Sequence, residues 1–297
     1  MKYAYFHLPG LFEFIDFYEV FLPLFFSNRE YFYDNRKISS IYGCKADCIW
    51  SAGRISNADV DSNRVLKLVD KYNISPRLTF SNSLISHEHL SDNKCNNICN
   101  EFSNSKAKTG IIIYSDLLLN YLKEKYPNFY YISTTTKVLT DFNDLVNELN
   151  RDEFDYVVPD FRLNKNINLC NQLNNKQKSK VELLCNECCP VYCLDRKECY
   201  ETVSKINIGL TDVCFKCKNS DGIHGYRFSE AMKNPSFISN DDIDGIYLKN
   251  DITNFKIEGR SLGSAILLEI LLYYFVKPEY QINVREEIYL NSSLDLF

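Results

Sequence analysis

The chain has 297 residues, of which 45% are hydrophobic, and this is enough for one large domain or two small ones. Its net charge of −5 excludes a basic surface covering the whole protein, of the kind that binds nucleic acid or anionic membranes. The sequence contains no P-loop, no dinucleotide-binding glycine motif and no serine-hydrolase motif, which argues against those three enzyme classes.

Eight short apolar runs predict strands, and most are continuous, as is typical of parallel strands covered on both faces. They lie at residues 3–8, 38–42, 77–81, 110–114, 129–133, 156–159, 180–184 and 254–258. The apolar N-terminal segment contains Glu13, Asp16 and Glu19 and no small-residue cleavage site, so we expect a strand and a buried helix and no signal peptide. The apolar segment near residue 270 carries Glu269 and is shorter than a membrane span, which favours a core helix and no membrane insertion.

Helical periodicity lies between these strands, at residues 11–26, 62–71, 115–125, 141–149, 196–206 and 264–275. Strand and helix alternate through the chain, which predicts an α/β protein with a TIM-like (β/α)₈ barrel, and a doubly wound open sheet is the alternative. We expect one domain over residues 1–297. Residues 185–235 form a cysteine-rich insertion between strands seven and eight, at the end of the barrel where active sites are built.

The chain has twelve cysteines. Without an export signal we expect a cytoplasmic protein, and in a reducing compartment such cysteines favour metal or cluster binding over disulfides. Five lie between residues 185 and 199 (Cys185, Cys188, Cys189, Cys193, Cys199), and Cys214 and Cys217 follow. This spacing suits either zinc or an iron–sulfur cluster. Cys44 and Cys48 could add a metal ligand. Cys95 and Cys99 could be either metal ligands or ordinary buried core thiols, and Cys170 suits an ordinary core position.

Polar residues follow several predicted strands, at the end of the barrel where catalytic groups gather. Lys256, Glu258 and Arg260 alternate along the eighth strand and so share one side of it, either as substrate-orienting groups or as a structural salt-bridge network. Arg54, beyond the second strand and near Trp50, could line a pocket. The remaining candidates for substrate binding or catalysis are Ser81, Asn82, Asp160, Asn186 and Glu187.

Two stretches, NECCPVYCLDRKECY and FISNDDIDGIYLKNDITNFKIEGRSLGSA, together resemble the collagenase-like peptidase family U-32. The resemblance implies a TIM-barrel-like domain. It also points to relatives that resemble oxygen-independent hydroxylation proteins of ubiquinone synthesis and tRNA modification, with a 4Fe–4S cluster on four cysteines. The positions that match are Cys189 and Cys193. We expect Cys185 and Cys217 to complete the set, ahead of Cys199 and Cys214.

The resemblance therefore implies an iron–sulfur enzyme that carries out a redox reaction or oxygen-independent hydroxylation on a small-molecule, tRNA-linked or peptide substrate. Glu187, Lys256 and Arg260 would act on the substrate, and Ser81, Asn82, Asp160, Asn186 and Arg54 would bind it. One alternative is a zinc-dependent peptidase or other hydrolase, in which the metal supplies the attacking water. Another is a non-catalytic, metal-stabilised subunit that requires a hetero- or homo-oligomeric partner.

Overall fold

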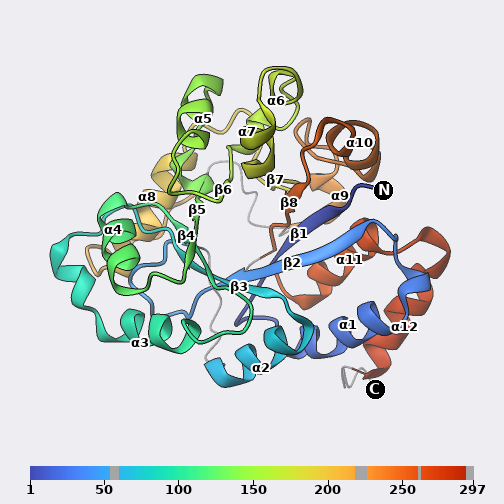
Figure 1. Ribbon diagram of the computed structural model, residues 1–297, viewed down its shortest axis with the longest axis horizontal. Helices are drawn as coiled ribbons and strands as arrows, with labels where there is room; N and C mark the ends of the chain where they lie inside the picture. Colours follow the sequence, from blue (N-terminus) through green and yellow to red (C-terminus); the bar gives the residue numbers. More distant parts are fainter. Residues whose placement is uncertain (54–59, 218–225, 260–261, 292–297) are drawn as a thin grey trace.

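The protein is described by a computed structural model that covers residues 1–53, 60–217, 226–259 and 262–291. Eight parallel strands form one sheet in the order β6-β5-β4-β3-β2-β1-β8-β7 (Figure 1). A parallel bridge from Val157 at the end of β6 to Val181 just before β7 brings the two edges of the sheet together. The nearly closed sheet confirms the predicted (β/α)₈ barrel over the open sheet.

Each predicted strand is present, with ends that differ by a few residues. The strands are β1 (Ala4–Pro9), β2 (Arg36–Gly43), β3 (Ser75–Phe80), β4 (Gly110–Ile113), β5 (Tyr130–Ser133), β6 (Tyr156–Val157), β7 (Glu182–Leu184) and β8 (Asn254–Lys256). All four residues of β4 are buried, because one face meets the helices and the other fills the barrel interior.

Helices surround the barrel (Figure 1). The six predicted helical segments correspond to α1 (Ile15–Ser27), α2 (Ser62–Tyr72), α4 (Asp116–Lys125), α5 (Phe142–Leu149), α8 (Arg196–Asn207) and α11 (Ser264–Phe275). The structure adds α3 (Asn93–Phe102), α6 (Asn168–Asn171), α7 (Asn175–Lys180), α9 (Phe228–Ala231), α10 (Asn240–Asp242) and α12 (Gln281–Asn291). Within the described ranges, no helix is both long and apolar enough to cross a membrane.

The barrel interior contains a buried ionic cluster near the N-terminal end of the strands. The carboxylate of Glu182 on β7 lies 2.5 Å from Arg77 Nη1 and 3.3 Å from Lys256 Nζ, and its Oε2 is 3.5 Å from Nε2 of His7. Burial alone would raise the pKa of Glu182, but Arg77 and its other basic neighbours hold it well below its usual range. An apolar layer of Tyr42, Ile112, Ile132, Val158 and Leu184 lies in the same interior.

The long connection between β7 and β8 turns back over the C-terminal end of the barrel. Its helix α8 is anchored to the loops that follow β2 and β3. Asn82 donates to the carbonyl of Ser204 at 3.1 Å, the backbone N–H of Ser83 donates to Ser204 Oγ at 3.2 Å, and Asn207 donates to the carbonyl of Ser51 at 2.5 Å. The cysteine-rich connection thus forms one wall of the barrel mouth.

Candidate metal centre at the barrel mouth

The candidate site begins where β7 ends, and Asn186 fixes the path of the chain there. Its side-chain oxygen accepts from the N–H of Glu258 at 2.8 Å, and its amide nitrogen donates to the carbonyl of Glu258 at 3.0 Å. These two bonds continue the pairing of β7 with β8 beyond the regular ladder. Asn186, a predicted substrate-binding residue, is fully buried in this contact. It thereby fixes the backbone at Glu258, to which it is bonded, and at Glu187, which follows it in the chain.

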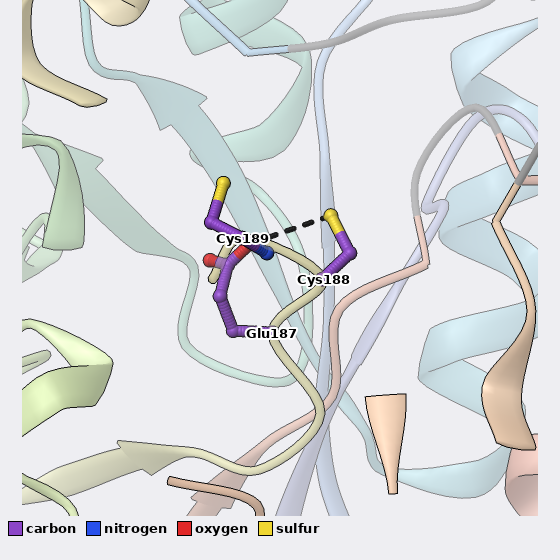
Figure 2. Close-up of side chains that lie close together, drawn as sticks. All are labelled: Glu187, Cys188 and Cys189. Carbon is purple, nitrogen blue, oxygen red and sulfur yellow. Dashed lines mark hydrogen bonds between the residues drawn. The ribbon is translucent and has the colours of Figure 1, made fainter. Parts of the chain in front are cut away.

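Glu187, Cys188 and Cys189 follow directly and bring their ligand atoms within 4.8 Å of one another. Figure 2 shows both thiols next to the Glu187 carboxylate, with a dashed line from the carboxylate to the Cys188 sulfur. Cys188 Sγ donates to Glu187 Oε1 at 3.5 Å, and the backbone N–H of Cys189 donates to the same oxygen at 3.1 Å. Two thiols and a carboxylate are donors that bind zinc or iron.

Arg196, at the start of α8, holds Glu187 in place. Its Nη2 lies 2.5 Å from Glu187 Oε2, and its Nε lies 3.3 Å from the carboxylate of Asp160. The guanidinium is also placed over the rings of Phe161 and Tyr200. Burial by itself would lower the pKa of Arg196, but Glu187 raises it, so the buried cation stays charged.

A small cavity of about 60 Å³ adjoins these donors on the side of the barrel interior. Such a volume holds a few water molecules or one small chemical group. The predicted residues Ser81, Glu187, Lys256 and Glu258 all line it, together with Tyr42, Thr79, Ile112, Thr134, Thr135, Thr136, Val158, Leu184 and Tyr200. Its walls thus combine hydroxyl groups, two carboxylates and one ammonium over an apolar floor.

Lys256 is held rigidly at the cavity. Its Nζ lies 3.6 Å from the centroid of the Tyr42 ring and 3.3 Å from Glu182 Oε1. Glu258, two residues further along, reaches Cys188: its Oε2 accepts from the backbone N–H at 3.3 Å, and its Oε1 accepts from the thiol at 3.8 Å. The alternation seen in the sequence therefore places both side chains at the mouth, and one of them touches the thiol-bearing loop.

Two further predicted binding residues serve the architecture of the mouth. Asp160 is fully buried, accepts from the backbone N–H of Arg162 at 3.1 Å and pairs with the guanidinium groups of Arg162 and Arg196. Asn82 is also fully buried and links the carbonyl groups of Ile49 and Ser204. Both anchor the long connection. Arg54 and Arg260 lie outside the described residues.

Among the predicted metal ligands, Cys185 lies on the side of β7 that faces away from the barrel interior. Along β7 the side chains of Glu182 and Leu184 face the barrel interior, whereas Cys185 lies in the core between the sheet and its helices, where burial raises the pKa of its thiol. Cys189 lies at the mouth. Cys193 is buried, and its carbonyl accepts from Arg162 Nη1 at 3.1 Å. Cys199 on α8 is half-buried, and Cys214 and Cys217 are exposed on the connection.

Cys188 is one of the cysteines whose spacing leaves them open as ligands, and it joins Glu187 and Cys189. Several other residues of the site are not among the sequence candidates. Arg196 and Tyr200 come from α8, and no local pattern marks them as partners of the mouth. The run Thr134–Thr136 does carry a signal, because three hydroxyl residues directly follow the fifth strand, where the C-terminal face of a barrel begins.

No family model matches the chain, and none of the curated proteins does. A solved structure described as that of the U32 peptidase Mk0906 is similar to this chain, with a TM-score of 0.49 and 10% sequence identity. The similarity covers 87% of this chain and 93% of that one. Mk0906 carries the family name to which the two sequence motifs point.

Proposed function

We propose that the thiolates of the β7–β8 connection hold an iron–sulfur centre at the barrel mouth, and that the protein uses it in a redox modification of a small-molecule or tRNA-linked substrate. The observation that supports this most directly is the group formed by Glu187, Cys188 and Cys189, whose donor atoms lie within 4.8 Å of one another and whose Glu187 also lines the cavity. Thiolates are the usual ligands of such centres.

The connection offers enough thiols for a four-cysteine cluster. Cys189 and Cys193 are the positions implied by the family resemblance, and Cys188 is the further thiol that the structure brings to the mouth. The fourth ligand in our proposal is Cys217, which is exposed on the same connection. Cys185 is left out because its thiol lies in the core on the helix side of β7. When bound, such a centre would supply single electrons to a substrate in the cavity.

The cavity defines what the protein's own residues would do. The ammonium of Lys256 is fixed between a carboxylate and an aromatic face, so it would bind an anionic or carbonyl oxygen of the substrate with little loss of side-chain entropy. The hydroxyl groups of Ser81 and Thr134 would orient the polar edge of that group. The small volume admits only a small molecule or the reacting end of a larger one.

The proposal is tested by purifying the protein without oxygen, recording its visible spectrum and measuring iron, sulfide and zinc. We expect a brown protein with about four irons per chain, the content of the 4Fe–4S cluster that the family resemblance implies. The double variant Cys188→Ser/Cys189→Ser should lose the colour. Cys170→Ser is the matched control, because this buried thiol lies on α6 outside the connection and should keep it. A colourless wild-type protein would rule out the redox proposal.

A mononuclear zinc hydrolase is the second candidate, because three donors from the protein leave a fourth position open toward the cavity. Here the same measurements would give one zinc and no iron at the mouth. The zinc would be lost from Cys188→Ser/Cys189→Ser and kept in Cys170→Ser. Hydrolysis of a peptide library that stops on chelation and returns with added zinc would then identify the activity.

A further inference from the structure

Two hydroxyl groups at the end of β3 line the cavity at the barrel mouth. Their residues, Thr79 and Ser81, are 3% and 1% exposed. Neither Thr79 Oγ1 nor Ser81 Oγ has a hydrogen-bond partner among the residues that the structure describes. A buried hydroxyl normally has such a partner, because losing its bonds to water otherwise costs free energy. The pair therefore indicates a ligand in the cavity that hydrogen-bonds to both groups.

The alternation of side chains along β3 explains why both hydroxyls reach the cavity. Leu78 and Phe80 pack in the core on the helix side of the sheet, whereas Arg77 reaches Glu182 in the barrel interior. Thr79 and Ser81 follow Arg77 at steps of two and so share its side of the strand. Their Cα atoms are about 7 Å apart, a span that one carboxylate bridges with an O–H···O bond of about 2.7 Å at each end.

A positive charge lies beside the same cavity. Lys256 lines it, and its Nζ is held 3.3 Å from Glu182 Oε1 and 3.6 Å from the centroid of the Tyr42 ring. Glu182 also forms the ion pair with Arg77, so two buried cations share this carboxylate. A buried cluster with this composition favours an anion over a neutral ligand in the adjoining cavity.

We propose that the cavity is a carboxylate-binding subsite, in which Thr79 and Ser81 donate to the two oxygens of one carboxylate and Lys256 supplies the opposite charge. The cavity volume of about 60 Å³ admits a group of this size. Glu187 and Glu258 also line it, and their negative charges oppose a dianion such as a phosphate monoester. The inference names a small organic acid as the substrate class of the proposed function, and it rests on that proposal in taking this cavity as the substrate site.

An NMR titration of the full chain with ¹³C-labelled acetate, at an ionic strength kept constant with chloride, tests the subsite. We expect saturable binding of acetate. The double variant Thr79→Val/Ser81→Ala should weaken this binding at least about 10-fold, because it removes two hydrogen bonds to a charged group. Ser62→Ala is the matched control and should bind acetate as the wild type does, because Ser62 is a buried hydroxyl on α2 that does not line the cavity. Unchanged affinity in the double variant, or no saturable binding to the wild type, would overturn the proposal.

A neutral analogue tests the charge of the ligand without any substitution. Acetamide has nearly the shape of acetate but no negative charge, so the unmodified protein should bind it at least about 10-fold more weakly. Equal affinity for the two would overturn the assignment of a carboxylate.

The iron–sulfur proposal and the carboxylate subsite can fail separately. Acetate binding needs no metal, so the Cys188→Ser/Cys189→Ser protein, which lacks the thiols at the mouth, should still bind acetate. A wild-type protein that binds acetate but holds no iron would refute the iron–sulfur proposal and support the subsite. An iron-loaded protein that does not bind acetate, with a Cys188→Ser/Cys189→Ser variant that also fails to bind it, would refute the subsite alone.

Discussion

Acidification from about pH 7.5 to about pH 5 should destabilise the protein by about 2 kcal/mol through His7 alone. This side chain is fully buried on β1, and its Nδ1 lies 2.8 Å from Ser40 Oγ. Burial, reinforced by the nearby Arg77, lowers the pKa of His7 to about 3. In the unfolded chain a histidine titrates near pH 6.5.

The sign follows from the two pKa values. Between about pH 6.5 and about pH 3, the unfolded chain binds a proton at His7 that the folded protein does not bind, so acid favours unfolding. Each pH unit in this window lowers the free energy of unfolding by about 1.4 kcal/mol, and the 1.5 units down to about pH 5 give the expected loss of about 2 kcal/mol. Glu182 also has a lowered pKa, but its contribution is lost only below about pH 4.3, where an unfolded glutamate titrates.

Urea unfolding followed by circular dichroism at several pH values measures this loss. The matched variant is His7→Asn, in which the amide oxygen replaces Nδ1 as the partner of Ser40 and nothing titrates. Its free energy of unfolding should depend less on pH than that of the wild type, by about 2 kcal/mol between the two ends of the range. Equal pH dependence in both proteins would show that His7 binds its proton in the folded protein over the same pH range as in the unfolded chain. That result would refute the lowered pKa of His7 on which the prediction rests.

Three other substitutions test separate parts of the structure. Glu182→Gln leaves two buried cations without their shared counter-charge and should lower the free energy of unfolding by about 3–5 kcal/mol in urea; a loss below about 1 kcal/mol would contradict this. Val138→Gly relieves a branched residue at φ 55° and should raise the free energy of unfolding by about 0.5 kcal/mol, whereas a fall would show that side-chain packing outweighs the strain. Glu187→Gln should weaken metal binding at the mouth about 10- to 100-fold in competition with a chelator, and unchanged affinity would remove Glu187 from the site.

The strands could be predicted because most read as short apolar runs, and β4 and β7 are buried along their whole length. Even β6, with two residues, lies inside a predicted run. Helix α3 was missed, although Cys95, Ile98, Cys99 and Phe102 follow helical spacing and are buried. Two of those four positions are cysteines, and a cysteine fills an apolar position as readily as it binds a metal, so the sequence alone could not separate the two roles.

Only those residues of the site that lie at the ends of predicted strands could be predicted from the sequence. Glu187, Lys256 and Ser81 follow from their places at the C-terminal ends of strands, and all three line the cavity. Asn82 and Asp160 occupy similar places but anchor the long connection. The buried parts of the β7–β8 connection need hydrogen-bond and ionic partners for their backbone and charged groups. Which strand-end residue becomes such a partner depends on how this connection folds back over the barrel. Local periodicity carries no information on that path.

The loop after β2 supports the barrel mouth through α8. Its carbonyl groups at Trp50 and Ser51 accept from the backbone N–H of Asn82 at 2.9 Å and from the side chain of Asn207 on α8 at 2.5 Å. A change in the path of this loop should therefore loosen the anchor of α8, and because Arg196 of α8 pairs with Glu187, it should also disturb the donors at the mouth.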